Sequence, residues 1–343
     1  MVPLYGKTLE ELKSIVLEEG LPAFSAKQIT EWLYKHNAES IDAMTNLSKK
    51  AREQLSAKYT VGLVKPEKVT ESADGTKKYL FPVLANRYVE AAYIPDKDRA
   101  TLCVSSQSGC KMGCLFCMTA KQGFQGNLTA GEILNQLRSI PEFEKVTNIV
   151  YMGMGEPFDN LDNVLKSIQI MTSDWGMGWS SKRITVSTIG LIPAMKQFIE
   201  STSCHLAISL HTPFDDERKT LMPIQNVHPI VDVIAELKKY RFTDHRRVSF
   251  EYIMFDGLND TPRHVKALVK LLNGLTCRIN LIRFHPIPGS PLRTSPDERI
   301  IQFRDSLTSK GIFTTIRASR GQDIQAACGL LSTKALQEKG RQQ

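Results

Sequence analysis

The sequence has no long apolar run, no low-complexity segment and no short internal repeat. No apolar stretch reaches the roughly 18 residues that a membrane helix needs. The opening residues, MVPLYGKTLEELK, show no basic-then-apolar pattern of a secretory signal. We therefore expect a cytoplasmic protein with no membrane partner, in which stable disulfides are rare. The chain has 343 residues, 42% of them hydrophobic, so it can bury one large core and a small second one.

Acidic residues are the scarcer charge, and the imbalance is local. The net charge is +8, and residues 241–320 hold 14 Lys and Arg against 7 Asp and Glu, so this stretch carries +7 of it. A local basic excess suits contact with a phosphate backbone. A mild excess is also common on ordinary solvated surfaces. Charge alone therefore leaves nucleic acid and solvent as equal alternatives.

The first 60 residues have helical patterns. Thr8 and Glu11 form a capping box, Ser25 is placed to cap a second helix, and residues 42–58 are predicted to form a third. A polar connector, KPEKVTESADGTKK, follows, with a tight turn at Asp74-Gly75. Two strand-like runs come next, KYLFPVLA and RYVEAAYIP.

From about residue 100, strands alternate with amphipathic helices. The predicted strands are TLCVSS, TNIVYMG, RITVSTIG, CHLAISLH, VSFEYIMF and RINLIRFH, followed by a last short strand, GIFTTIRA; helices begin near Thr129, Asn160, Leu191, Pro229, Pro262 and Ser295. Regular β-then-α repetition predicts a parallel sheet with right-handed crossovers. The predicted class is α/β: a partial (β/α)6 barrel with a small N-terminal helical accessory domain and a short β extension. A doubly wound open sheet has the same local pattern and remains an alternative.

We predict four segments from these patterns. They are a helical accessory domain over residues 1–60, a linker and β-hairpin extension over 61–98, a barrel over 99–320, and a C-terminal segment over 321–343. Unusual residues follow the predicted barrel strands: three cysteines after the first, MGMGEP after the second, Ser187 at the third, Ser209-Leu210-His211 at the fourth and His285 at the sixth. Because chemistry in such barrels gathers at strand ends, one common site is predicted.

Cys110, Cys114 and Cys117 lie within eight residues in the order C-x3-C-x2-C. Structural zinc usually takes four ligands as two spaced pairs, and here Cys103 is the one candidate for a fourth. Cys204 and Cys277 are isolated in apolar strands and are expected to be buried, inert thiols. A [4Fe-4S] cluster held by three thiolates keeps one iron open for another ligand. A zinc-containing RNA-binding protein remains the alternative from another class.

The C-x3-C-x2-C spacing, with Phe116 before the last cysteine, resembles the signature of the radical S-adenosylmethionine (SAM) superfamily. Longer stretches resemble the RlmN family of adenine-C2 RNA methyltransferases, which modify 23S ribosomal RNA and transfer RNA: TLCVSSQSGCKMGCLFCMTAKQGFQGNLTAGEI, VYMGMGEPFDNLDNV, ITVSTIGLIPAM, HLAISLHTP and RGQDIQAACGLL. The similarity runs over almost the entire chain. It implies a radical SAM barrel, a [4Fe-4S] cluster, two SAM molecules per turnover, an RNA partner and a one-electron reductant such as flavodoxin. We expect a monomer.

The resemblance also implies roles for single residues. Cys110, Cys114 and Cys117 hold the cluster, whose open iron takes the amino and carboxylate groups of SAM. The residues implied to contact SAM are Gly155, Glu156, Ser187, Ser209, Leu210, His211 and His285. Glycine at position 155 allows close backbone contact, and the carboxylate of Glu156 suits an ammonium group.

The implied reaction uses three further residues. Cys328 takes a methyl group from one SAM, the radical from a second SAM removes a hydrogen from it, and the carbon radical adds to adenine. Glu90 then removes the carbon-2 proton, and Cys103 attacks Cys328 to release the methylated base as a disulfide forms. Without the resemblance, strand alternation predicts a solvent-facing Glu90, and both cysteines would be inert buried thiols.

Two positions depart from the family pattern. His285 stands where the family usually has Asn, and Gly126 stands where it tends to have Arg. These changes bear on local SAM or RNA contacts and leave the cluster, Glu90 and both redox cysteines untouched. Carbon-8 methylation, as in the related Cfr type, remains an alternative because that type shares the cluster and the cysteine pair.

Overall fold

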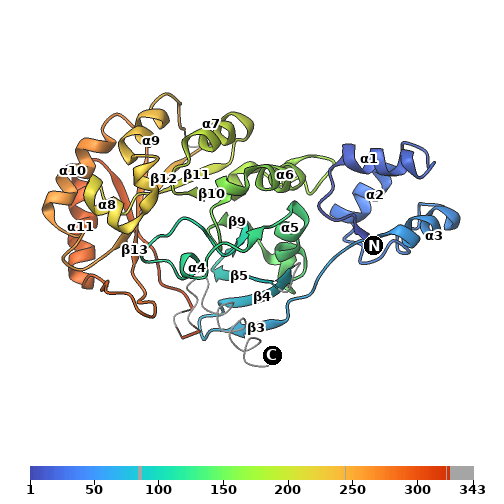
Figure 1. The fold of residues 1–343 in the computed structure, drawn as a ribbon, viewed down its shortest axis with the longest axis horizontal. Helices are drawn as coiled ribbons and strands as arrows, with labels where there is room; N and C mark the ends of the chain where they lie inside the picture. Colours follow the sequence, from blue (N-terminus) through green and yellow to red (C-terminus); the bar gives the residue numbers. More distant parts are fainter. Residues whose placement is uncertain (84–86, 244, 322, 325–343) are drawn as a thin grey trace.

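The computed structural model describes residues 1–83, 87–243, 245–321, 323 and 324 (Figure 1). Cys328 therefore lies outside the described residues. The helices are α1 (Leu9–Glu18), α2 (Ser25–Tyr34), α3 (Lys49–Lys58), α4 (Met118–Lys121), α5 (Ala130–Arg138), α6 (Leu161–Thr172), α7 (Ile192–Ser201), α8 (Asp215–Leu221), α9 (Ile230–Leu237), α10 (Pro262–Leu272) and α11 (Asp297–Ser309). Among these residues, no helix combines the length and apolarity required to cross a bilayer.

Ten strands form one sheet in the order β14-β13-β12-β11-β10-β9-β6-β5-β4-β3. They are β3 (Lys68–Glu71), β4 (Lys77–Val83), β5 (Arg87–Asp96), β6 (Arg99–Cys103), β9 (Asn148–Tyr151), β10 (Ile184–Thr188), β11 (His205–Ser209), β12 (Val248–Met254), β13 (Arg278–Arg283) and β14 (Phe313–Ile316). From β6 to β14 all neighbours are parallel, whereas β3, β4 and β5 add an antiparallel extension beside β6. Six β-then-α units followed by β14 confirm the predicted partial barrel.

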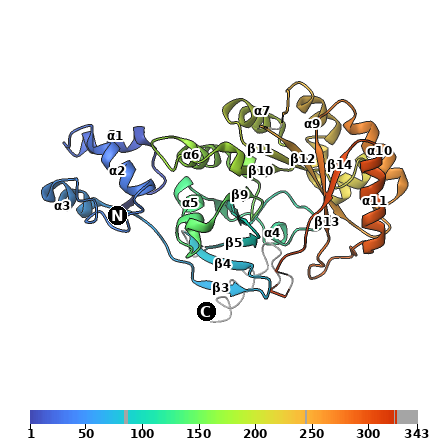
Figure 2. The same cartoon turned by 180° about the vertical axis from the view of Figure 1, so that it is seen from behind.

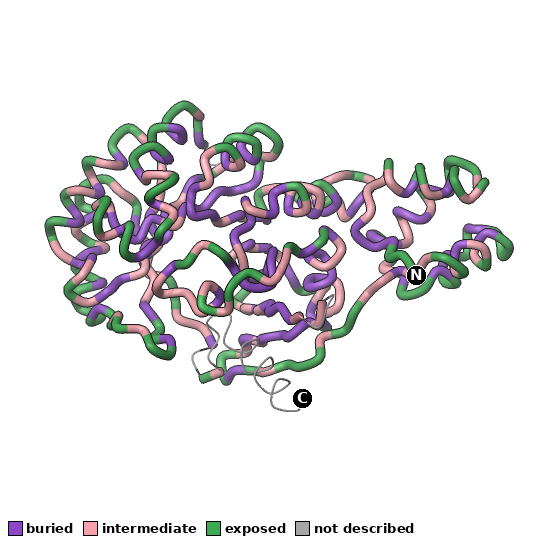
Figure 3. Tube along the Cα trace, in the orientation of Figure 1, coloured by how far each residue is buried: buried purple, intermediate pink, exposed green. Residues whose placement is uncertain are grey.

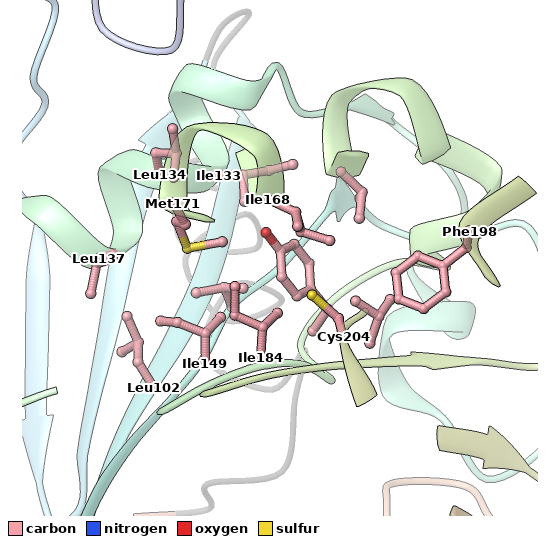
Figure 4. Close-up of a cluster of buried hydrophobic side chains, with 14 of the residues drawn as sticks. Leu102, Ile133, Leu134, Leu137, Ile149, Ile168, Met171, Ile184, Phe198 and Cys204 are labelled. Atoms are coloured by element: carbon pink, nitrogen blue, oxygen red, sulfur yellow. The ribbon is translucent and has the colours of Figure 1, made fainter. Parts of the chain in front are cut away.

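The main core lies between the parallel strands and the helices that follow them. Leu102, Ile149 and Ile184 are register partners on β6, β9 and β10, and all three are buried. Figure 4 shows them facing apolar side chains of α5 and α6, including Leu137 and Met171. Because alternate residues of a strand face opposite sides, the other side of the same strands is left for different side chains. Burial follows the strands, while exposure is concentrated on the outer helices (Figure 3).

The N-terminal helices pack beside α5 and α6, away from α10 and α11, as both views show (Figures 1 and 2). Lys166 on α6 forms an ion pair with Glu11 on α1 at 2.5 Å. Gly6, with φ of +88°, lies so close to Gly131 that an added Cβ would stand 2.3 Å from its Cα. Glycine is therefore required there to let the two backbones meet. A two-stranded pairing of β1 (Val2–Pro3) with β2 (Tyr59–Thr60) closes this part of the chain.

The predicted helix starts were right in part. The capping box of Thr8 and Glu11 is present, as is the start of α5 after Thr129. Ser25 is the first residue of α2 rather than its cap, and it makes no side-chain capping bond. The third helix begins at Lys49, capped by Ser48, and not at residue 42. The sequence between the two positions forms turns instead.

Several short elements were missed in the predictions. The polar connector contains β3, which pairs with β4 across the Asp74-Gly75 turn. Helix α8 follows β11, and the short α4 follows the cysteine loop. A further two-stranded pairing joins β7 (Gln107–Ser108) to β8 (Gly126–Asn127) on either side of that loop. The four predicted domain bounds remain predictions.

Candidate functional site

The cysteine loop follows β6, the first strand of the parallel sheet, and leads into α4. Cys110 and Cys114 are buried and Cys117 is partly exposed. Burial raises the pKa of the Cys110 thiol to about 12, and the nearby Cys117 pushes it in the same direction. Burial also raises the pKa of Cys114, with Cys117 and Cys110 adding to the shift. The Cys117 N–H donates to the Cys114 carbonyl at 3.1 Å, and the Cys110 N–H donates to the Gly123 carbonyl at 3.2 Å, so the three cysteines lie on one tightly turned loop.

An apolar cluster surrounds this loop. It contains Cys114 together with Leu221, Met222, Phe255 and Phe284. Phe116 packs edge-on against the His211 ring, with centroids 4.7 Å apart, and contacts Phe255. A low-dielectric surrounding of this kind excludes water from a redox cofactor and tunes its potential.

The donor set fits a four-iron cluster better than zinc. Three thiols gather in the loop, which is the number that leaves one iron of a [4Fe-4S] cluster open. Within the described ranges, no group of three or more His, Cys, Asp or Glu side chains is already arranged to hold a metal ion, and this applies equally to a four-iron cluster and to a zinc site completed by Cys103.

The MGMGEP loop after β9 packs directly on the start of the cysteine loop. The backbone N–H groups of Ser106 and Gln107 both donate to the Met154 carbonyl, at 2.9 and 3.2 Å. A Cβ added at Gly155, where φ is +95°, would stand 2.5 Å from the Gln107 Cβ. The close approach of the two loops therefore requires glycine at position 155, independently of any contact with a ligand.

Glu156 is buried at the centre of this arrangement. Its Oε1 accepts from the Thr188 hydroxyl at 2.6 Å and from the Phe158 N–H at 3.1 Å, and its Oε2 accepts from the Ile189 N–H at 3.0 Å. Burial raises the pKa of the carboxyl to about 7, despite these donors. Glu156 also lies near Cys110 and Cys114, whose pKa values it helps to raise. The carboxyl therefore joins the cysteine loop to the end of β10.

Arg218 on α8 connects the ends of β10 and β11. The guanidinium is completely buried and donates to the carbonyls of Ile189, Ser209 and Leu210 at 3.0 to 3.2 Å, and to Gln225 at 2.7 Å. Burial lowers the pKa of Arg218 to about 10, which leaves it charged at neutral pH. Its positive charge acts on Cys114 by lowering the pKa of that thiol.

His211 ends this connected set of residues in a left-handed conformation, with φ of +60°. A non-glycine residue there is strained unless its surroundings fix it. The Asn259 amide donates to the His211 carbonyl at 2.6 Å, and the Ile253 N–H donates to Nδ1 at 3.0 Å. Burial lowers the pKa of His211 to about 3, so the ring is neutral and carries its proton on Nε2.

The structure thus brings together most of the predicted SAM residues. Glu156 is linked through Ile189 and Arg218 to Ser209 and Leu210, and Gly155 and His211 are their direct neighbours in sequence. Ser187 is partly exposed and directly precedes Thr188, which bonds Glu156. His285 follows β13 and is exposed.

Glu90 and Cys103 share one face of the antiparallel extension. Ala92 on β5 pairs with both Lys78 on β4 and Cys103 on β6, and Glu90 lies two residues from Ala92. Such diagonal neighbours have Cα atoms roughly 7–8 Å apart. The Ser105 hydroxyl donates to the Glu90 carbonyl at 2.6 Å and accepts from the Met154 N–H at 2.8 Å. This face is therefore joined to the MGMGEP loop.

The expectation from strand alternation, a solvent-facing Glu90, is wrong. The side chain is 2% exposed and forms an ion pair with Lys78, also 2% exposed, at 2.6 Å between Nζ and Oε2. Both faces of β4 and β5 are covered in the middle of these strands, whereas β3 at the edge of the sheet is largely exposed, so alternation of polar and apolar residues does not report exposure on β4 and β5. The sequence reasoning missed Lys78 altogether, although a lysine on a strand otherwise made of large apolar residues was a signal.

The departure at Gly126 has a structural explanation. A Cβ at this position would stand 1.8 Å from the guanidinium of Arg87. Arg87 also donates to the neighbouring Gln125 carbonyl at 2.7 Å. An arginine at position 126 would require the end of the flexible Arg87 side chain to move aside, and Arg87 already supplies a guanidinium at this place.

The basic stretch 241–320 is less free than its composition suggests. Several of its arginines form ion pairs with carboxylates, including Arg283 with Asp297 at 2.7 Å and Arg320 with Asp96 at 2.9 Å. Paired charges attract phosphate less than free ones. The local excess is therefore weaker support for RNA binding than the count implied.

Cys204 and Cys277 are placed as expected for inert thiols. Figure 4 shows the Cys204 sulfur in the apolar core near Ile184 and Phe198. Cys277 is partly buried and packs against the same core. Burial raises the pKa of each thiol to about 12. A cavity of about 760 Å³ near Cys204 is lined by Thr8, Lys166 and Trp179 among others, and none of the predicted site residues lines it.

Comparison with known proteins agrees with this geometry. Residues 104–272 match the Radical SAM superfamily, and residues 2–61 match a ribosomal RNA large subunit methyltransferase N-terminal domain. The chain is 56% identical over 339 residues to a probable dual-specificity RNA methyltransferase RlmN of Bacteroides fragilis (strain YCH46), covering 99% of this chain and 98% of that protein. Identity to the Phocaeicola vulgatus protein of the same description is 57% over 338 residues, covering 98% and 97%.

A solved structure is similar over the same extent. The crystal structure of a radical SAM methyltransferase from Sphaerobacter thermophilus superposes with a TM-score of 0.89 at 39% identity, covering 96% of this chain and 98% of that one. The similarity thus includes the N-terminal helices, the antiparallel extension and the barrel.

Proposed function

The chain belongs to the RlmN family of radical SAM RNA methyltransferases, and from this premise we propose that it methylates carbon 2 of adenine in 23S ribosomal RNA and transfer RNA. We propose that the methyl group passes through Cys328 as S-methylcysteine and that a transient disulfide with Cys103 releases the product. The observation that carries the proposal is the gathering of three thiols beside Glu156 at the ends of the first strands.

Membership of the superfamily implies a [4Fe-4S] cluster and SAM as cofactors. Cys110, Cys114 and Cys117 would hold the cluster. The proposed residues for SAM are Gly155, Glu156, Ser187, Ser209, Leu210, His211 and His285. When bound, these cofactors supply the radical that removes hydrogen from a methyl group. A radical route is required because adenine carbon 2 is electron-poor and cannot attack the methyl group of SAM as a nucleophile. Two SAM molecules per turnover are proposed, one as methyl donor and one as radical source.

The remaining steps fall to residues of this chain. Glu90 is proposed to remove the carbon-2 proton from the RNA adduct, and Cys103 to attack the Cys328 sulfur. Their common face and close register support a shared site. The disulfide that results must be reduced before the next turnover. A one-electron reductant such as flavodoxin, an RNA partner and a monomeric state belong to the same proposal.

The chain that precedes Cys328 is anchored near this face. Asp323 accepts from the Ser72 hydroxyl and, at 3.1 Å, from the Ala73 N–H, while the Gly321 N–H donates to Asp74 at 3.0 Å. The Gly321 N–H, followed by Thr76, holds the pKa of Asp74 well below its ordinary value. The turn between β3 and β4 therefore holds the chain five residues before Cys328.

Chain length allows this anchor to serve Cys103. Five residues span at most about 18 Å. Lys78 lies two residues after Thr76, the end of the anchoring turn, and is separated from Cys103 by two strand spacings, roughly 10 Å. A span of this length is compatible with a meeting of Cys328 and Cys103, which supports the proposal.

Removal of the anchor is expected to slow methyl transfer without affecting the radical chemistry. For Asp323→Ala we expect about tenfold slower methylation, because the effective concentration of Cys328 at the site falls. Formation of 5′-deoxyadenosine from SAM should stay at the wild-type rate. Methylated RNA and 5′-deoxyadenosine are both measured in one reaction. The control is Asp98→Ala, which removes an exposed carboxylate from the neighbouring β5–β6 turn. An unchanged methylation rate in Asp323→Ala would contradict the anchoring role.

The raised pKa of Glu156 makes SAM binding pH-dependent. The amino group of SAM donates hydrogen bonds preferentially to the carboxylate form, whose fraction grows as pH rises through about 7. Affinity for S-adenosylhomocysteine, which has the same amino group, is expected to rise about tenfold from pH 6 to pH 8. Anaerobic calorimetry measures this affinity, and in Glu156→Gln the pH dependence should disappear. A flat wild-type profile would remove Glu156 from the site of the amino group.

Mass spectrometry of the product tests the proposed function directly. RNA incubated with reduced, cluster-loaded protein and SAM should yield 2-methyladenosine. A product carrying 8-methyladenosine would instead favour the Cfr type of reaction, which uses the same cluster and cysteine pair. If neither product forms while SAM is still cleaved, methyl transfer to adenine is rejected.

A further inference from the structure

A polar layer crosses four adjacent parallel strands on the side opposite the helix-packed core. Ser209 on β11 pairs in register with Glu251 on β12, Glu251 with Asn280 on β13, and Asn280 with Thr315 on β14. Residues in register on parallel strands face the same side of a sheet. Their neighbours in sequence, such as Phe250 and Leu281, belong to the core instead. The inner side of the barrel is therefore polar at this level, unlike the packed interior of a closed barrel.

Glu251 is the charged member of this layer, and its carboxylate is oriented by the others. Its Oε1 accepts from the Asn280 amide at 2.7 Å, and the Asn280 oxygen accepts from the Thr315 hydroxyl at 2.8 Å. The Glu251 side chain is 5% exposed, and Arg317 lies 3.6 Å from Oε2 as an ion-pair partner. The carboxylate is thus buried, fixed in direction and partly balanced in charge.

The second oxygen of this carboxylate has unused capacity. Among the residues that the structure describes, no donor forms a hydrogen bond to Glu251 Oε2, although the atom is buried. A buried carboxylate oxygen without a donor is costly, and such atoms are normally satisfied by a partner. An oriented acceptor of this kind suits a donor that arrives with a ligand.

The position of Glu251 connects it to the proposed SAM site. Its backbone carbonyl accepts from the N–H groups of Leu210 at 3.0 Å and His211 at 3.4 Å, so the strand that holds Glu251 also supports these residues. Its side chain faces the same side as Ser209. A ligand that contacts Ser209 from the inner side therefore approaches Glu251.

Three kinds of donor exist on SAM: the ammonium, the exocyclic amine of adenine and the ribose hydroxyls. The ammonium is excluded because the guanidinium of Arg317 beside Oε2 would repel it. The methionine end also belongs beside the cysteine loop, where Glu156 and not Glu251 influences the thiols. Carboxylates are the common partners of nucleotide ribose hydroxyls, which are neutral donors.

Building on the proposed function, we propose that Glu251 Oε2 accepts a hydrogen bond from a ribose hydroxyl of SAM. This bond fixes the ribose, and with it the 5′ carbon, relative to the cluster. Asn280 and Thr315 are positioning residues that act through Glu251. The assignment adds a second carboxylate to the site, at the nucleoside end, opposite in role to Glu156 at the methionine end.

Ligand binding tests the assignment without turnover. The probes are S-adenosylhomocysteine and its 2′-deoxy and 3′-deoxy analogues, titrated anaerobically by calorimetry into the cluster-loaded protein. In the wild type, loss of the bonded hydroxyl is expected to weaken binding about tenfold to a hundredfold, as for a hydrogen bond to a charged group. Glu251→Ala should weaken S-adenosylhomocysteine to a similar extent and bind the deoxy analogue equally well.

Controls separate this assignment from the proposed function. Glu298→Gln, an exposed carboxylate on α11, should bind all three probes as the wild type does. If Glu251→Ala fails to fold, Glu251→Gln serves instead and should show a reduced penalty for the missing hydroxyl. The ribose contact is overturned if the wild type binds all three probes with equal affinity. It is also overturned if the Glu251 variant loses as much affinity as the wild type when the hydroxyl is missing. Either result leaves the proposed function untouched. No binding of S-adenosylhomocysteine to cluster-loaded wild type rejects the SAM site itself, and with it the proposed function.

Discussion

Replacement of Cys114 by alanine is expected to abolish both the iron-sulfur cluster and methyl transfer. The three thiols form a minimal set, so the loss of one leaves two ligands for four irons. Changes that only touch the surroundings of a metal ligand already cost up to about a hundredfold in affinity or activity, and loss of a ligand should exceed this. Iron and sulfide content, visible absorption after anaerobic reconstitution and methylated RNA are the measurements.

Cys204→Ala is the matched control for this substitution. Cys204 is also a buried thiol with a raised pKa, but it lies in the apolar core and not in the cysteine loop. This variant is expected to keep its iron and its activity, with a loss of stability of about 1 kcal/mol, typical of a small core change. A Cys114→Ala protein that remains brown and active would contradict the assignment of the loop. A colourless wild type that holds one zinc ion would favour the zinc alternative.

The cysteine loop could be predicted from sequence because its information is local. Three cysteines within eight residues keep their thiols close in almost any loop conformation, and the preceding strand places the loop at one end of the sheet. The positions of Glu156 and Ser209 followed in the same way, since each stands at the end of a strand whose periodicity is clear. Parallel strands deliver such ends to one edge.

The partners of these residues could not be predicted, because they depend on packing between distant segments. Arg218 lies on a short helix that the sequence reasoning missed. Its four acceptors are Ile189 just after β10, Ser209 and Leu210 at the end of β11, and Gln225 in the 3-10 helix that follows α8. The polar layer around Glu251 becomes visible only when four strands are set in register. In one strand, VSFEYIMF, a single glutamate gives no sign of which side it faces or what it meets.

The antiparallel extension shows the same limit more sharply. Polar and apolar residues alternate along its strands, which usually indicates that one face is exposed to solvent. The resulting expectation that Glu90 is exposed was wrong. Burial of both faces of β4 and β5 follows from their place between β6 and the edge strand β3 in the large sheet. The alternating polar residues therefore lie on the inner side, where the proposed chemistry takes place.

Replacement of Lys78 by methionine is expected to be among the most destabilising changes in the protein. Removal of one partner from a buried ion pair costs about 3–5 kcal/mol, because the other charge loses the interaction that compensated its burial. Methionine preserves the length and most of the volume of the lysine side chain, so a cavity contributes little. Urea denaturation should show the loss, and Lys68→Met, an exposed lysine on β3, should change stability by less than about 0.5 kcal/mol.

The double variant Lys78→Met with Glu90→Gln separates stability from chemistry. It removes both charges, so part of the stability lost in Lys78→Met should return, as expected for directly interacting side chains. Methyl transfer should not return, because Glu90 is the proposed general base and loss of such a base costs about a hundredfold or more. Lys78→Met with wild-type stability would mean that the 2.6 Å pair adds nothing to the fold. Glu90→Gln with wild-type methylation would remove Glu90 from the reaction, and the buried pair would then be purely structural.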